Sequence, residues 1–352
     1  MIKFFRKIRQ QLLTENKFSK YLVYAVGEIV LVVIGILIAL QINNLNEERK
    51  SQKRLANFLI EIQNNLSSDI TKANYIIDKF IEEDSILRNI TLNKVNLTQE
   101  KHTENRRSFT LIFEFENFRL KTKGFDGLVN NIDYIPDEYT EVMTLLNDIY
   151  IEKNNELVTL NQRVQTNTYG NRDNLKTKSG SSKFWDWELT EDMITYFQSN
   201  SYKNEVRHYF NDNHEFVTRV IRFKILAINA YKEIAKLTNT DIPIPQHVNY
   251  TYPDLERLSE FAGDYQIEQG EKHFSDSFKF IVDNNQLQWR YEYKDVNYDE
   301  EFNVPLYWHK NNIFILYQSA SFWEFKKTKT GTIIYTQRMN GTRNSYIKRT
   351  KG

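Results

Sequence analysis

The chain has 352 residues and a formal net charge of +1. This length is enough for two globular domains, and 14% aromatic residues argue against a largely disordered protein. The near-zero net charge argues against a dedicated nucleic-acid-binding protein. Because the sequence contains no cysteine, disulfides, thiolate zinc sites, iron–sulfur clusters and cysteine nucleophiles are excluded.

An apolar run near the N-terminus predicts a transmembrane helix over residues 21–42. Residues 21–40 include thirteen Leu, Ile and Val residues, and their only charged member is Glu28. A helix of that length spans about 30 Å, the thickness of a bilayer core. The apolar side chains contribute roughly −4 to −8 kcal/mol to insertion, against about +2.5 to +3.5 kcal/mol for one carboxylate. A buried core helix and a cleaved signal peptide are the alternatives, and both usually have shorter apolar runs.

Basic residues are distributed unequally about this span. Residues 1–20 contain six Lys or Arg, and four more follow the span at Arg49, Lys50, Lys53 and Arg54. The positive-inside rule therefore favours a cytoplasmic N-terminus. Within the tail 1–20, apolar residues at helical spacing predict a short basic amphipathic helix over 2–13, on the inner leaflet.

Three residues of the span share one helical face. Glu28, Gly35 and Ala39 lie at offsets of 0, 7 and 11. Gly35 and Ala39 form a small-xxx-small pair, the spacing that lets two helices approach closely. One interpretation is a membrane-helix interface with a functional acid, used for self-association or for another membrane protein. The other is that Glu28 is protonated or reaches toward the cytoplasmic side of the bilayer, and the sequence leaves both open.

The first fifty residues contain a distinctive motif. Residues 27–44 read GEIVLVVIGILIALQINN and follow a basic, Phe-rich tail. This pattern resembles the opening of an uncharacterised family of single-pass membrane proteins from Bacteroidota-type genomes, with one departure at Leu45, where that family often has Trp. The resemblance implies a membrane protein with a large extramembrane part, and it implies no activity. We therefore expect a protein of the bacterial inner membrane with residues 43–352 in the periplasm.

Helical periodicity continues beyond the span and predicts a helical domain over 43–240. Apolar residues recur at spacings of three and four from Leu55 to Phe80, with no Pro or Gly between them. This pattern predicts one long helix, continuous with the membrane span, that ends near Asn89. The stripe is not a strict heptad, so packing within the chain is favoured over a coiled coil. Similar patterns over 137–165 and 204–237 indicate a helical bundle.

Two segments within this domain are predicted to be irregular. Residues 121–128 are predicted as a turn region, and the overlapping stretch TKGFDGLVNN resembles a segment of the same membrane-protein family. Residues 170–182 are rich in Gly, Ser, Lys and Asn and are predicted as a loop.

The C-terminal part has a different periodicity. Three of the five prolines, Pro243, Pro245 and Pro253, predict a linker over 241–254. From Phe261 the apolar period changes to two, and about eight short strands predict an antiparallel meander over 255–352 that closes into a small barrel or a strongly curved sheet. LSEFAGDY, at 258–265, resembles the opening of small lipocalin-like β-domains. The predicted fold class is α+β: a transmembrane helix, a helical bundle and a barrel-like meander.

Residue patterns with catalytic chemistry are weak. His208, Asp212 and Glu215 share one helical face and are candidate metal ligands, with a solvated helix surface as the alternative. No G-x-S-x-G, G-x-G-x-x-G or Walker-type motif occurs. The motifs S-x-x-K at 345–348 and K-T-G at 329–331 occur in the order opposite to that of β-lactamase-like enzymes. We therefore expect no catalytic residues.

Trp289, Trp308 and Trp323 are candidate walls of a ligand pocket in the β-domain, with core packing as the alternative. The first functional hypothesis is a non-enzymatic, single-pass, membrane-anchored envelope protein whose exported region binds or interacts. Its expected partners are the bilayer and a second membrane helix, with no cofactor and no nucleic acid. A small-ligand-binding membrane sensor is the second hypothesis, and a metal-dependent enzyme is the third.

Overall fold

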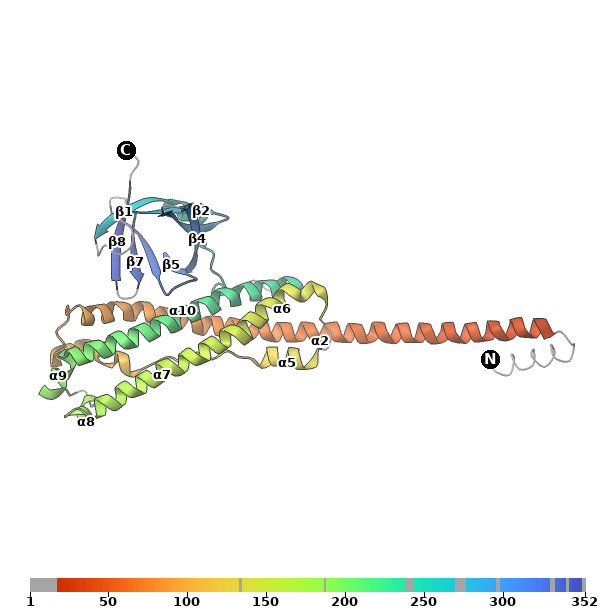
Figure 1. Ribbon diagram of the computed structural model, residues 1–352, viewed down its shortest axis with the longest axis horizontal. Coiled ribbons are helices and arrows are strands. Elements are labelled where there is room, and N and C mark those ends of the chain that lie inside the picture. The colour runs from red at the N-terminus through yellow and green to blue at the C-terminus, as the bar shows by residue number, and fades with distance from the viewer. Residues whose placement is uncertain are drawn as a thin grey trace.

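The computed structural model describes residues 18–132, 135–186, 188–238, 244–269, 277–295, 298–329, 333–339 and 342–349. It confirms the α+β class: a long N-terminal helix leads into a helical bundle, and a C-terminal antiparallel β-structure lies against the side of that bundle (Figure 1). The predicted amphipathic helix over 2–13 lies outside the described residues.

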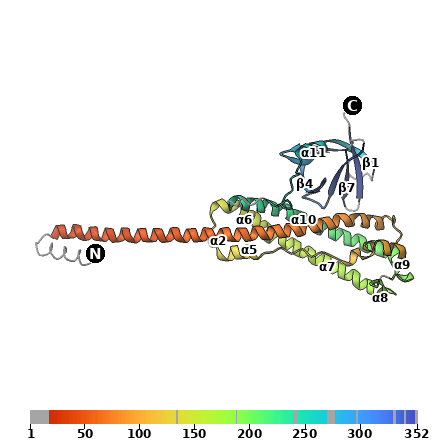
Figure 2. The same cartoon turned by 180° about the vertical axis from the view of Figure 1, so that it is seen from behind.

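Helix α2 (Phe18–Thr91) is one unbroken helix of 74 residues. In its N-terminal part, all fourteen Leu, Ile and Val side chains of the predicted span, residues 21–42, are at least 45% exposed. Farther along, the eight residues of the predicted stripe from Leu55 to Phe80 are at most 2% exposed. The stripe packs within the chain, as its irregular spacing predicts. The same helix thus leaves the apolar segment and enters the bundle core without a break (Figures 1 and 2).

Helix α10 (Asn200–Leu237) organises the bundle because it packs against both α2 and α7 (Asn154–Lys176). The predicted loop over 170–182 is wrong in its first part, since α7 continues to Lys176. One glycine, Gly170, costs a helix only about 1 kcal/mol. The apolar face of α7 continues past it, with Leu175 buried.

The prediction of a turn region over 121–128 is also wrong, because most of that segment belongs to helix α5 (Lys123–Asn131). This helix lies directly on α2. A Cβ atom on Gly124 would lie 3.0 Å from the backbone nitrogen of Ile62, and one on Gly127 would lie 2.6 Å from the ring of Phe58. The glycines therefore allow close helix packing in place of the turn that their composition indicates.

The remaining helical segments are short. They are α3 (Gln99–Glu104), α4 (Arg107–Thr110), η1 (Leu111–Phe113), η2 (Asp137–Tyr139), α6 (Thr140–Asn147), the π-helical segment η3 (Asp148–Lys153), α8 (Ser181–Phe184), α9 (Glu191–Gln198) and α11 (Leu255–Phe261).

The β-structure is a closed barrel in which the eight strands of the described chain pair in sequence order and β1 closes on β8. The strands are β1 (Gly263–Gln269), β2 (Ser277–Asp283), β3 (Gln286–Asp295), β4 (Tyr298–Lys310), β5 (Ile313–Leu316), β6 (Phe322–Lys327), β7 (Ile333–Met339) and β8 (Thr342–Lys348). Aromatic side chains fill the interior, among them Tyr265, Phe278, Phe280, Trp323, Phe325 and Tyr346.

One outer face of the barrel belongs to the core of the bundle. Ile315, Ala320 and Phe322 are buried among the helix side chains, whereas Phe314, the neighbour of Ile315, points into the barrel core. The ring centroid of Phe322 lies 5.8 Å from that of Phe80 on α2. Strand β5 is therefore apolar on both faces, and the barrel is attached to the bundle by a continuous apolar contact.

Candidate functional site

A buried chain of polar side chains crosses the junction between the barrel and the bundle. Nζ of Lys224 on α10 lies 2.9 Å from Nδ1 of His309 on β4. Nε2 of the same imidazole lies 2.7 Å from Oδ1 of Asp78 on α2. Lys310 also contacts that carboxylate oxygen at 2.7 Å. Three elements that are distant in the sequence are thus joined at one point, which we call the junction site.

A β-bulge brings two consecutive residues of β4 to Asp78. Trp308 is opposite Phe314 and Lys310 is opposite Ile313, so β4 has one more residue here than β5. Such a bulge interrupts the alternation of side chains between the two faces of a strand. Both His309 and Lys310 consequently reach the helix, while Trp308 stays with the barrel core.

Burial sets the protonation of the junction site. It lowers the pKa of His309 to about 4, an effect that the nearby Lys224 strengthens and Asp78 opposes. It also lowers the pKa of Lys224 to about 7. Burial alone would raise the pKa of Asp78, but hydrogen bonds from His309 and Lys310 lower it overall. A neutral His309 then accepts a hydrogen bond from Lys224 at Nδ1 and donates one from Nε2 to Asp78.

The site contains residue types used in acid–base chemistry, but they are enclosed. Lys224 is 1% exposed and His309 is 8% exposed, so a substrate has no direct approach to either ring nitrogen or to the amine. Satisfied polar groups buried between two elements fix their relative position. The arrangement therefore suits positioning of the barrel on α2 and α10.

Helix α10 makes further polar contacts with the barrel. Arg222 donates to the carbonyl oxygens of Tyr317 and Gln318, both at 3.2 Å. The backbone N–H of Ala320 donates to Oγ1 of Thr218 at 3.0 Å. The segment that joins β5 to β6 is thus held on α10 over several residues.

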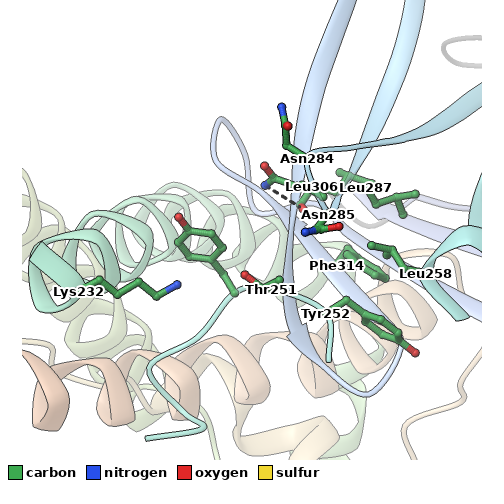
Figure 3. A pocket seen from close by; sticks show the side chains of 11 residues that line it. Lys232, Thr251, Tyr252, Leu258, Asn284, Asn285, Leu287, Leu306 and Phe314 are labelled. Atoms are coloured by element: carbon green, nitrogen blue, oxygen red, sulfur yellow. Dashed lines mark hydrogen bonds between the residues drawn. The ribbon is translucent and has the colours of Figure 1, made fainter. Parts of the chain in front are cut away.

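A cavity of about 240 Å³ lies close to this junction, where the barrel meets α10 and the segment before α11 (Figure 3). Lys232, Tyr250, Asn285, Leu306 and Phe314 are among the residues that line it. It lies beside the β2–β3 turn. The interior of the barrel is filled by aromatic rings.

The structure places the three predicted pocket tryptophans in the barrel core and away from this cavity. Trp323 is fully buried and Trp308 is 8% exposed. Trp289 is partly buried, with its ring centroid 5.2 Å from that of Trp323.

The three candidate metal ligands lie on α10, but two of them form ion pairs with an arginine and the third does not. Asp212 and Glu215 both pair with Arg163 of α7, and Asp212 also accepts a hydrogen bond from Asn167. His208 is exposed. Within the described ranges, no group of three or more His, Asp or Glu side chains has an arrangement that could hold a metal ion.

The proposed membrane-helix interface lies on the free part of α2. Glu28 is half-exposed, and a Cβ atom on Gly35 would meet no atom within 4 Å. Since the apolar stretch of this helix is not buried by the described chain, the face with Gly35 and Ala39 is open to lipid or to another helix.

Residues 28–110 of the sequence match a family of unknown function (DUF6090). The matched segment extends from the apolar part of α2 to α4 and includes Asp78, but neither Lys224 nor His309. No curated protein and no solved structure matches the chain. Among the described residues, α2 is the one helix that is long and apolar enough to cross a membrane.

The sequence patterns did not single out the junction site, although one signal was present. Lys224 occupies an apolar position of the α10 pattern, in line with Val217, Ile221 and Ile228. A lysine in such a position is buried only when a partner compensates it.

Proposed function

We propose that this protein is a single-pass, membrane-anchored component of the bacterial cell envelope. In this proposal its exported region, residues 43–352, has a binding or interaction role and no catalytic activity. The N-terminus is cytoplasmic and the bundle and barrel are periplasmic. The matched family corresponds, in this proposal, to the Bacteroidota-type membrane proteins whose motif residues 27–44 resemble.

The continuity of α2 is the observation that supports this proposal best. One end of the helix exposes the fourteen Leu, Ile and Val side chains of residues 21–42, and the other end supplies the buried stripe of the bundle. Exposed apolar surface of that extent is strongly unfavourable in water and favourable in a bilayer. The enclosed junction site, in which the buried polar groups contact one another, favours a positioning role over catalysis.

Reporter fusions test the orientation. Alkaline phosphatase is active only after export, whereas green fluorescent protein fluoresces when it folds in the cytoplasm. We expect a phosphatase fused after Gly352 to be active and a fluorescent protein at the same position to be dark. An inactive phosphatase beside a bright fluorescent fusion would overturn both the topology and the localisation.

A membrane sensor for a small ligand is the second candidate, and the junction site favours it. Asp78 contacts the barrel through His309 and belongs to the same helix as the apolar segment. A conformational change in the barrel would therefore be transmitted to α2. In this hypothesis the signal passes to a partner through the face with Glu28, Gly35 and Ala39.

A metal-dependent enzyme is the third candidate, and elemental analysis of the purified protein distinguishes it from the other two. We expect no stoichiometric zinc, iron or manganese. One bound metal per chain that is lost in His208→Ala would support the enzyme.

A further inference from the structure

The cavity beside the β2–β3 turn has walls from three separate parts of the chain. The turn forms one wall, the segment before α11 forms the second, and Lys232 of α10 reaches the cavity from the bundle (Figure 3). Its volume of about 240 Å³ is below the range of about 300–1,000 Å³ for drug-sized ligands. The cavity therefore suits a small molecule.

The surface that this cavity offers to a ligand is polar. Its most buried lining residues are at most 5% exposed and belong to the barrel core: Tyr252, Leu258, Leu287, Leu306 and Phe314. The lining side chains that are partly or fully exposed are those of Lys232, Tyr250, Thr251, Asn284, Asn285 and Gln286. Since the apolar side chains are closed off, the cavity suits a hydrophilic ligand.

Lys232 supplies a cation without a counter-charge. Its amine lies 4.6 Å from the ring centroid of Tyr250 and is directed toward Thr251 in Figure 3. No Asp or Glu is among the described lining residues, and within the described chain no carboxylate pairs with this amine. Burial lowers the pKa of Lys232, and the charge of Lys236 lowers it further. An anion bound beside the amine would offset both effects.

Two uncharged polar groups accompany this cation. In the part of the chain that the structure describes, neither the hydroxyl of Thr251 nor the side-chain amide of Asn285 makes a hydrogen bond. A hydroxyl and a carboxamide each donate and accept hydrogen bonds, and so does a hydroxyl group of a ligand. An ionised carboxylate only accepts. The two side chains therefore match a ligand that has hydroxyl groups in addition to its negative charge.

Backbone contacts hold these groups in place. Oδ1 of Asn249 accepts a hydrogen bond from the backbone N–H of Thr251 at 3.0 Å, and the carbonyl oxygen of Tyr250 accepts one from a backbone N–H of β4 at 2.8 Å. Asn284 and Asn285 have φ values of 49° and 61°, which define the type I′ geometry of a tight hairpin. Groups that are positioned before the ligand arrives reduce the ordering cost of binding.

We propose that this cavity binds a small polyhydroxylated monocarboxylate, a molecule of the sugar-acid class. The carboxylate pairs with Lys232, and the hydroxyl groups bond to Thr251 and Asn285. One lysine and no acidic residue select a single negative charge. The inference rests on the proposed binding role and names its ligand class. Its failure would leave the result of the reporter fusions, which test the anchored topology, unaffected.

Calorimetry with three six-carbon probes tests this proposal on the full chain in lipid nanodiscs, with empty nanodiscs as the reference. Gluconate has the carboxylate and the hydroxyl groups, sorbitol has hydroxyl groups without the charge, and hexanoate has the charge without the hydroxyl groups. We expect saturable binding of gluconate at one site per chain. Sorbitol should bind about tenfold or more weakly, because a charge-assisted hydrogen bond is lost. Hexanoate should bind about fivefold or more weakly, because neutral hydrogen bonds are lost.

Variants locate the site. Lys232→Met removes the charge and should weaken gluconate binding about tenfold or more. Lys236→Met is the matched control, because this exposed lysine lies one turn farther along α10, outside the cavity, and should bind gluconate as the parent does. Asn285→Gly removes the amide but keeps a residue that accepts the positive φ of the turn. It should weaken gluconate binding about threefold or more and leave hexanoate binding unchanged.

Four results would each overturn the proposal. They are absence of saturable gluconate binding, equal affinity for gluconate and either of the other two probes, unchanged gluconate affinity in Lys232→Met, and tighter binding of inorganic phosphate than of gluconate. Urea unfolding midpoints equal to that of the parent exclude misfolding as the cause of weaker binding in a variant.

Discussion

His309 on β4 lies 2.7 Å from Asp78 on α2, so the barrel touches the same helix that contains the membrane-length apolar segment. From Leu40 to Asp78 this helix rises about 55 Å at 1.5 Å per residue. The sequence has no Pro or Gly between Gly35 and Gly124 to interrupt it. A displacement at the junction site can therefore be transmitted along a single rigid element.

The low pKa of His309 should make the protein sensitive to acid. Its pKa is about 4 in the folded chain, against 6.5 for an ordinary histidine. The unfolded chain binds more protons between these two values, so stability falls as the pH drops through them, by on the order of 3 kcal/mol. His309→Gln keeps an acceptor for Lys224 and a donor for Asp78 but does not titrate. Urea unfolding near pH 7 and near pH 4 should show a smaller loss of stability in the variant.

The comparison of the parent protein with His309→Gln separates the contribution of His309 to the pH dependence from that of other titrating groups. Burial raises the pKa of Asp69 to about 6, despite the opposing hydrogen bond from the Lys121 backbone. That carboxyl stabilises the folded state on acidification in both proteins. Equal losses in parent and variant would show that the junction site does not titrate as described.

The apolar contact between barrel and bundle should contribute strongly to stability. Phe322 is 2% exposed and packs on Phe80. Phe322→Ala should lower the free energy of unfolding by about 3–5 kcal/mol, as for other buried phenylalanines. Phe302→Ala, at a position that is 38% exposed on β4, should change it by about 0.5 kcal/mol or less. Similar unfolding midpoints in urea for the two variants would contradict the docking of β6 on α2.

Two glycines should respond oppositely to added side chains. Gly124→Val places atoms against the backbone of Ile62 and should destabilise the protein by about 1–3 kcal/mol. Gly170 lies within α7 with open space around it, so Gly170→Ala should stabilise the protein by about 0.5–1 kcal/mol. Thermal unfolding measures both, and a stabilised Gly124→Val would exclude the close packing of α5 on α2.

The face with Gly35 and Ala39 should mediate helix association in the membrane. A hydrogen bond from Glu28 to a neighbouring helix would contribute on the order of 0.6–2 kcal/mol. Gly35→Leu should weaken association more than Gly27→Leu, because Gly27 lies about 100° away from Glu28 around the helix. A membrane-dimerisation reporter with residues 15–45 measures this. If Gly35→Leu and Glu28→Leu both associate as the parent does, this face does not drive self-association.

Sequence periodicity was sufficient to predict the elements that have long regular patterns. The stripe from Leu55 to Phe80 and the alternation of Phe278 and Phe280 each recur often enough to define a face, and the structure buries both sets. The glycines of α5 misled the prediction because glycine marks turns and close helix contacts alike. Only the position of Ile62 in space distinguishes the two.

The junction site could not be predicted because its partners are far apart in the sequence. Asp78 lies on a helix and His309 on a strand more than two hundred residues later, and the intervening order of elements does not specify their distance. The bulge at His309 leaves no composition signal, since β4 continues on both sides of it. Only Lys224, in an apolar helical position, was visible in the pattern.

Cysteine labelling of intact spheroplasts tests the anchored, exported topology most directly, since the chain contains no cysteine of its own. Single variants Ser51→Cys, just beyond the span, and Tyr169→Cys, exposed on α7, should react with a membrane-impermeant maleimide before lysis. Gln10→Cys should react only after lysis. Labelling of Gln10→Cys in intact spheroplasts, with Ser51→Cys and Tyr169→Cys protected, would contradict the account.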